Sequence, residues 1–312
     1  MSSRDWDATT YDRVSEPQLA WAREQLARLE LVGDESVLDA GCGSGRVTVE
    51  LAQRVPRGHV YAVDAAPSMV QHARQALGER ATVLCQDLVE LELPEPVDAI
   101  FSNATFHWVH DHDALFAALA RNTKPGARLV AQCGGRGNID DFRAAADSVA
   151  GEEPFDHYFV GWQRPWNYAS AEETTRRLEH AGFSQVSCWL EPKPTTLAEP
   201  RAFVETVCLV RHLDPLPEGL RGPFIDRVLA RAGDPLVLGY MRLNMTARRT
   251  CAPGADLGQR WPGDIPCTVQ ASDADGGNLA DGPASDSAAR RRDRPGDHRA
   301  CGGGPQGRRS RV

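Results

Sequence analysis

Short apolar runs alternate with amphipathic segments along the first half of the chain. The apolar runs cover residues 36–40, 59–64, 81–85, 97–102 and 127–133. Between the first two runs, Val47, Leu51 and Val55 have the four-residue spacing of one helix face. Further helices are predicted from Ser15 to about Leu29, over 67–77 and over 113–122. This alternation predicts an α/β fold, in which a mostly parallel sheet is covered by helices on both faces.

The pattern loosens after Gly135. A helix is predicted over 138–149, and aromatic residues follow from Phe155 to Tyr168. Ser170 begins another helix, which should end at Gly182. The remaining predicted elements are a strand over 185–190, helical segments over 200–213 and 216–232, and a last strand over 236–247. We expect the segments at about 150–168 and 198–233 to form a lid beside the sheet.

Composition divides the chain near residue 250. Glycine and proline make up 17 of the 62 residues from 251 to 312, and this stretch contains no Glu and no Lys. Its few large apolar side chains cannot offset the entropy lost on ordering. We therefore expect one folded domain over 1–250 and a low-complexity, disordered tail over 251–312. The tail is either a dispensable linker or an out-of-frame extension.

Charge and hydropathy exclude several classes of partner. The chain has 43 acidic and 35 basic residues, a net charge of −8, and the first 250 residues alone carry −9. Such a surface repels a phosphate backbone, so no nucleic-acid partner is expected. No apolar run is long enough to span a membrane, and the polar N-terminus lacks a secretory signal, which favours a cytoplasmic protein without a membrane partner. The eight cysteines include no C-x-x-C pair that would indicate zinc.

A glycine-rich turn joins the first predicted strand to the helix that follows it. The turn reads Asp39-Ala40-Gly41-Cys42-Gly43-Ser44-Gly45, and Asp64 ends the next strand 19 residues later. Bare backbone amides with an acidic residue at this distance indicate a nucleoside-containing cofactor. The carboxylate would accept hydrogen bonds from the ribose hydroxyls of that cofactor. A dinucleotide would require glycine where Arg46 stands. Asp39 would also oppose a pyrophosphate, whereas it suits the ammonium group of an amino acid.

These motifs resemble those of the class I S-adenosylmethionine-dependent methyltransferases. Residues 37–45 are similar to the family's first motif, and Val63-Asp64-Ala65-Ala66-Pro67-Ser68-Met69 is similar to its second. Phe106-His107-Trp108 and Asp111-His112-Asp113 resemble the small-molecule branch that includes trans-aconitate methyltransferase. The resemblance implies a Rossmann-like, doubly wound sheet of seven strands, the last of them antiparallel. It also implies S-adenosyl-L-methionine as cofactor and S-adenosyl-L-homocysteine as product.

The resemblance further implies a set of cofactor-binding residues. Asp39, Gly41, Gly43 and Gly45 would surround the methionine end, and Asp64 would bind the ribose. Asn103 would face the methionine moiety, and Tyr11 would close over the cofactor. The adenine would lie among Ala65, Met69, Asp87 and Leu88. Met69 and Leu88 are also explained by ordinary core packing.

The acceptor side is less specific. His107 is a candidate base, and a hydrogen-bonded structural histidine is the alternative. Because in-line methyl transfer needs no metal and the side chains of residues 107–113 should diverge, we expect no metal. The predicted substrate pocket contains Trp108, Tyr158, Trp162, Trp166 and Arg211.

The leading hypothesis is methyl transfer to a small-molecule acceptor, with a carboxylate or hydroxyl oxygen as the expected target. A non-catalytic, cofactor-binding regulatory module is the main alternative. A nucleic-acid methyltransferase would carry a [DN]-P-P-[YFW] turn where this chain has Asn103-Ala104-Thr105-Phe106. Arg46 disfavours a nicotinamide-dependent oxidoreductase. The acceptor and the oligomeric state are left open.

Overall fold

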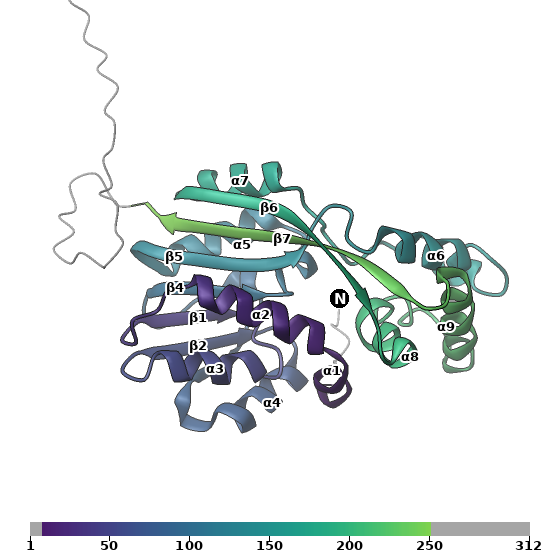
Figure 1. The fold of residues 1–312 in the computed structure, drawn as a ribbon, viewed down its shortest axis with the longest axis horizontal. Helices are drawn as coiled ribbons and strands as arrows, with labels where there is room; N and C mark the ends of the chain where they lie inside the picture. Colours follow the sequence, from purple (N-terminus) through teal and green to yellow (C-terminus); the bar gives the residue numbers. More distant parts are fainter. Residues whose placement is uncertain (1–7, 251–312) are drawn as a thin grey trace, which may run out of the picture. The chain divides into compact units, whose positions relative to one another are not determined.

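The computed structural model describes residues 8–250, whose strands form a seven-stranded sheet (Figure 1). The strand order is β3-β2-β1-β4-β5-β7-β6. All neighbours pair in parallel except β5 with β7 and β6 with β7, which are antiparallel. The strands are β1 (Ser36–Ala40), β2 (His59–Asp64), β3 (Thr82–Cys85), β4 (Val97–Asn103), β5 (Thr123–Gly134), β6 (Phe183–Thr196) and β7 (Val237–Arg249). The predicted fold class, including the antiparallel last strand, is confirmed.

Helices cover both faces of the sheet because its central strands are apolar on both sides. On β1, Val37 belongs to an apolar cluster that includes residues of α2, α3 and α4, and Leu38 belongs to a cluster that includes residues of α5 and α7. Both side chains are fully buried. The helices are α1 (Ala8–Val14), α2 (Glu16–Arg28), α3 (Arg46–Arg54), α4 (Pro67–Leu77), α5 (His112–Arg121), α6 (Asp140–Ala150), α7 (Ala171–His180), α8 (Pro200–Phe203) and α9 (Glu218–Ala232). None of these helices combines the length and hydrophobicity that a membrane span requires.

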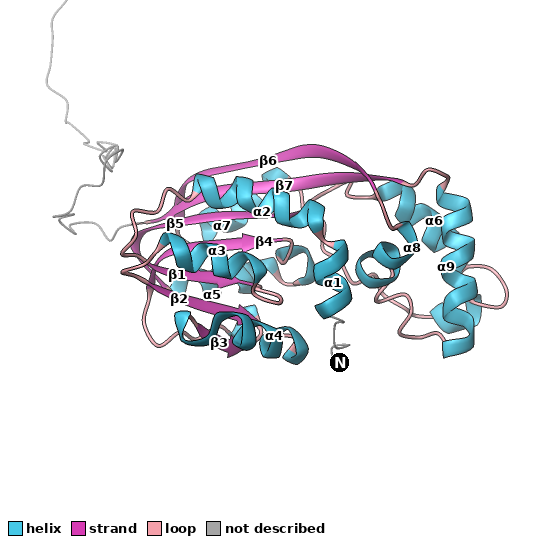
Figure 2. Cartoon of the chain, turned by 60° about the horizontal axis from the view of Figure 1, so that its bottom comes forward, coloured by secondary structure: helices cyan, strands magenta, loops and turns pink. Residues whose placement is uncertain are grey.

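A second apolar cluster lies beyond the carboxyl ends of the parallel strands. Figure 2 shows β6 and β7 running past the sheet toward α6, α8 and α9. The pairing agrees, because β5 ends opposite Arg242 while β7 still pairs with β6 back to Val237. Phe155, Phe203 and Phe224 are fully buried in this cluster. We call residues 139–160 and 203–240, which supply most of it, the lid.

Two predicted elements differ from the structure. The strand predicted over 185–190 is β6, which runs from Phe183 to Thr196 despite Pro192 and Pro194. It is an edge strand, where a missing N–H leaves no neighbouring strand unpaired. The helix predicted over 200–213 is only α8 and one π turn at Val204–Cys208. The predicted tail over 251–312 lies outside the described residues.

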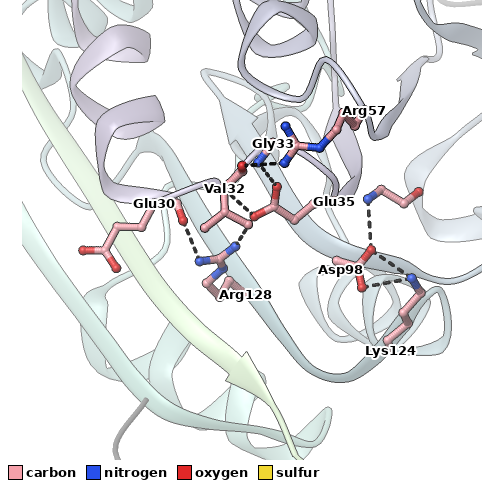
Figure 3. Close-up of polar contacts among 9 residues, drawn as sticks. Glu30, Val32, Gly33, Glu35, Arg57, Asp98, Lys124 and Arg128 are labelled. Atoms are coloured by element: carbon pink, nitrogen blue, oxygen red, sulfur yellow. Dashed lines mark hydrogen bonds and ion pairs between the residues drawn. The ribbon is translucent and has the colours of Figure 1, made fainter. Parts of the chain in front are cut away.

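A buried ion pair closes the end of the sheet opposite the strands' carboxyl ends (Figure 3). The Glu35 side chain is 1% exposed and pairs with Arg128 at 2.8 Å. It also accepts hydrogen bonds from the backbone N–H of Val32 at 2.9 Å and of Gly33 at 2.8 Å. Burial alone would raise the pKa of Glu35, but these donors and Arg128 together lower it below its ordinary 4.5. The ionised carboxylate therefore stabilises the fold.

Glu35→Gln should lower the free energy of unfolding by about 3 kcal/mol, because Arg128 is left partly buried without a counter-ion. Lys124→Met is the matched control, since Lys124 pairs with Asp98 while 48% exposed and should contribute less than about 1 kcal/mol. Denaturant unfolding measures both. Because the folded pKa is lowered, the effect of Glu35→Gln should be complete above the ordinary pKa of 4.5 and shrink as the pH falls below it. Equal losses in the two variants would contradict this assignment.

Candidate active site

A cavity of about 1220 Å³ opens at the carboxyl ends of β1, β2 and β4. The chain leaves β1 toward β2 on one side, while β4 flanks β1 on the other, so the sheet order reverses here. Open α/β sheets bind their ligands at such a point. Side chains from α1, α2, β7 and the lid complete the wall. Every cofactor residue predicted from the sequence except Gly45 lines this cavity.

The glycine turn has a closed side and an open side. Gly41 has φ +86°, and a Cβ there would lie 2.1 Å from Thr105 Oγ1, so no other residue fits without displacing Thr105. At Gly43, with φ +54°, a Cβ would meet nothing within 4 Å. Gly45 begins α3 and packs on α4 rather than on the cavity. The open backbone at Gly43 is thus available to a ligand.

Asp64 connects the glycine turn to the start of α4. Its Oδ2 accepts the Gly43 N–H at 2.9 Å, and its Oδ1 accepts the Ala66 N–H at 2.9 Å. Burial raises the pKa of Asp64, although both backbone donors oppose that shift. Each carboxylate oxygen retains a second lone pair, with which it can accept a hydrogen bond from a ribose hydroxyl.

Asp39 is a buried carboxylate without a counter-ion among the described residues. Its side chain accepts a hydrogen bond from Thr48 Oγ1 at 2.7 Å, and the residue is 2% exposed. Burial, and in lesser part the charge of Asp64, raise its pKa to about 7. A bound cation would lower this pKa again. The site therefore suits an ammonium group.

The other predicted cofactor residues fall into two groups. Tyr11 is on α1 and packs against Ala66 and Met69, and burial raises its pKa to about 12. Asp87 accepts the Val89 N–H at 3.1 Å. Ala65 and Leu88 also line the cavity, as Met69 and Asp87 do, and this group can form the walls of an adenine site.

Asn103 lies at the end of β4, and its amide N–H donates to the Gln18 carbonyl at 3.1 Å. Its Oδ1 is buried and has no hydrogen-bond partner within residues 8–250. The Gln18 side chain lines the same cavity and also has an unpaired buried oxygen. Both acceptors are therefore available for donors of a ligand.

His107 is held at the cavity wall by the short 3-10 turn Phe106–Trp108. The Gly134 backbone N–H donates to its Nδ1 at 3.3 Å. Its ring lies against Trp108 and Tyr168, at centroid distances of 5.3 and 5.7 Å. Burial first, then the charge of Arg242, lower the pKa of His107 well below 6.5. The ring is neutral at physiological pH.

The predicted substrate-pocket residues are divided by the structure. Trp108, Trp162, Trp166 and Arg211 line the cavity. Trp166 stacks on Tyr168 at 5.8 Å with 7° between the ring planes, so these aromatics form a continuous wall. Tyr158 is outside the cavity wall and packs on the apolar cluster of the lid. Within residues 8–250, no His, Cys, Asp and Glu side chains are grouped as a metal site.

Arg242, which was not predicted from the sequence, lines the cavity from β7. The residue is 2% exposed, and its guanidinium carbon lies 4.8 Å above the Trp21 ring. Nε donates to Gln132 Oε1 at 3.1 Å, while Nη2 is buried and without a hydrogen-bond partner in the described part of the chain. No described Asp or Glu forms an ion pair with it. The sequence offered no local signal for it, because Arg248 and Arg249 lie in the same strand.

Comparison with known proteins identifies relatives of this chain. A family model described as a methyltransferase domain matches residues 37–126. Trans-aconitate 2-methyltransferase of Methylobacterium nodulans is 31% identical over 269 residues, which cover 79% of this chain and 99% of that protein. Malonyl-[acyl-carrier protein] O-methyltransferase of Anoxybacillus flavithermus is 38% identical over 124 residues, 39% of this chain and 48% of that protein.

Solved structures share the fold. The YcgJ protein of Bacillus subtilis superposes with a TM-score of 0.53, covering 75% of this chain and 100% of that one at 15% sequence identity. At this identity the likeness concerns the fold alone.

Binding of S-adenosyl-L-homocysteine should strengthen as Asp39 ionises. Between pH 5.5 and 7.5 its Kd should fall by at least about ten-fold, because a carboxyl group of pKa about 7 is mostly protonated at the lower pH. Calorimetry across this range measures the effect. Asp39→Asn should bind more weakly at pH 7.5 and lose the dependence. If the slope persists in Asp39→Asn, another group such as Asp64 causes it and the prediction is wrong.

Proposed function

We propose a carboxylate oxygen as the methyl acceptor of this chain, which belongs to the class I S-adenosylmethionine-dependent methyltransferases. As a member, it is an enzyme that transfers methyl groups from S-adenosylmethionine to small molecules. The family assignment excludes the nicotinamide-dependent alternative. What remains is the chemical class of the acceptor, for which the cavity offers one decisive feature.

That feature is the buried guanidinium of Arg242. Burying a charge without a counter-ion is costly, and such a group is retained where a ligand supplies the opposite charge. Its planar donors match a carboxylate in geometry. Since Nη2 has no partner among residues 8–250, an acceptor carboxylate would complete the pair. The proposal rests on this observation.

The glycine-turn side of the cavity fits the cofactor. When bound, S-adenosylmethionine supplies an electrophilic methyl group on a positively charged sulfur. Asp39 would hold its ammonium group, and the backbone at Gly43, which no Cβ covers and whose N–H donates to Asp64, would lie against its methionine end. Asp64 would accept hydrogen bonds from the ribose hydroxyls. The cavity thus presents negatively charged side chains to the cofactor and a positively charged side chain to the acceptor.

A carboxylate needs no proton removed before it attacks a methyl group. In the proposed step its oxygen forms a bond to the methyl carbon while the carbon–sulfur bond breaks, and the bonding electrons go to sulfur. An anion and a cation become a neutral ester and a neutral thioether. Trp108, Trp166 and Tyr168 exclude water from this wall of the cavity, which strengthens the attraction between the two charges.

The names of the relatives support the same acceptor class. One is a methyltransferase of trans-aconitate, which is a carboxylic acid, and the other is an O-methyltransferase of a malonyl group. We infer from both that this enzyme O-methylates a small acid.

Arg242→Met should lower kcat/KM for the best acid acceptor by about 100-fold, because an interaction with a buried charge is lost. Its free energy of unfolding should be unchanged or higher, since a buried unpaired charge is removed. Arg143→Met is the matched control, because Arg143 also lies over an aromatic ring, that of Tyr168 at 5.2 Å, but pairs with Asp140 outside the cavity wall. Methyl transfer to a panel of acids and their primary amides, together with thermal melting, measures these effects.

Two outcomes would contradict the proposal. Equal transfer to an acid and to its amide would show that the anion is not recognised. A large loss of S-adenosyl-L-homocysteine affinity in Arg242→Met would show that Arg242 binds the cofactor's own carboxylate.

A further inference from the structure

We propose that His107 is a specificity-determining hydrogen-bond donor, whose neutral ring gives Nε2–H to the acceptor carboxylate and removes no proton. This inference rests on the proposed function, which names the acceptor class. In this role His107 donates a hydrogen bond to the acceptor, whereas a base would remove a proton from it. The geometry of the ring carries it.

The tautomer of His107 is set by a backbone donor. Gly134 N–H donates to Nδ1 at 3.3 Å, and an amide N–H cannot accept a hydrogen bond. Nδ1 must therefore present its lone pair, which leaves the single proton of the neutral ring on Nε2. A base would need a free lone pair facing the acceptor, and the only lone pair of this ring is already occupied.

The ring is also fixed in position. The His107 carbonyl accepts the Asn167 N–H at 2.9 Å, and the ring is packed between Trp108 and Tyr168. A Cβ on Gly134 would lie 2.6 Å from Tyr168 Cε1, so the donor residue can approach only because it is glycine. Rotation of the ring would leave the Gly134 N–H buried without an acceptor.

His107 and Arg242 meet at the same residue. Gly134 is the last β5 residue paired with β7, and its partner there is Arg242. Both side chains line the cavity. Two donors therefore come from the 3-10 turn Phe106–Trp108 and from β7 to one region, which suits the two oxygens of a single carboxylate.

The surroundings keep the ring neutral. The titratable groups that face it are Arg242 from β7, His112 from α5, Cys133 from β5 and Tyr168 from the segment before α7. None of these is anionic at neutral pH. Burial raises the pKa of the Cys133 thiol to about 12, and burial also raises the pKa of the Tyr168 hydroxyl above its ordinary value. In the part of the chain described, His107 forms no ion pair with a carboxylate. The acceptor would bring the first negative charge to this ring.

The tautomer can be tested without activity. In enzyme labelled with ¹⁵N-histidine, the His107 resonances should show a bare Nδ1 and a protonated Nε2 from pH 5.5 to 8.5, with His107→Gln used to assign them. A protonated Nδ1, or a titration within this range, would overturn the proposal even if acids are methylated. If instead no acid is methylated, the proposed function fails while the tautomer is still measured.

Two substitutions of His107 distinguish the role of a hydrogen-bond donor from that of a base. Gln places an amide nitrogen near the position of Nε2, whereas Asn reaches only as far as Nδ1. With an acid acceptor, His107→Gln should retain kcat/KM to within about ten-fold of the wild-type value, and His107→Asn should lose about 100-fold, mainly through KM. The wild-type profile at saturating S-adenosylmethionine should be flat from pH 6 to 8.5. A limb near the imidazole pKa that both variants abolish would establish a base and contradict the proposal.

Discussion

The guanidinium of Arg242 is a buried charge that the described protein does not neutralise, and the proposed acceptor site depends on this unpaired charge. Trp21 covers one face of the group and Gln132 accepts from Nε, so the side chain cannot move out to water. Gln132 in turn donates to Asn244 at 2.7 Å, and Asn244 donates to Glu191 at 3.2 Å. These neutral amides orient the guanidinium but separate it from Glu191, the nearest acid of the network. The charge is thus preserved for a ligand.

The cavity contains two buried side chains of opposite charge, Asp39 and Arg242. Asp39 is held where burial raises its pKa to about 7, and Arg242 is held where burial lowers its pKa. A cationic cofactor would offset the cost of burying Asp39, and the proposed anionic acceptor would offset the cost of burying Arg242, so each ligand would stabilise the residues that it contacts. Methyl transfer to such an acceptor would then remove both ligand charges near the reacting atoms. A low-dielectric cavity favours that neutralisation, although donors on the carboxylate reduce its nucleophilicity in part.

Much of the sheet and its helices could be predicted because their signals are local. β1, β2 and α4 begin and end where the predicted ranges 36–40, 59–64 and 67–77 put them. α1 and the long extension of β6 were missed. A proline usually ends a strand. β6 can contain Pro192 and Pro194 only because it lies at the edge of the sheet, and that position depends on the tertiary structure.

The cofactor end was predictable for the same reason, since its glycines and Asp64 lie within one sequence motif. The acceptor end depends on contacts between residues far apart in the chain. Arg242 is 110 residues from Gln132, and Gly134 is 27 residues from the ring it orients. Neither the burial of Arg242 nor the tautomer of His107 has a local signature, and Tyr158 could not be assigned to the lid interior from aromatic content alone.

A crystal structure of the enzyme with S-adenosyl-L-homocysteine and an acid acceptor would show directly which residues bind the acceptor. We expect an acceptor carboxylate within hydrogen-bond distance, about 3 Å, of an Arg242 Nη atom and of His107 Nε2. We also expect the ammonium group of the cofactor product to lie against Asp39. A structure in which Arg242 instead binds the carboxylate of the cofactor product, with the acceptor anchored elsewhere, would contradict the proposal.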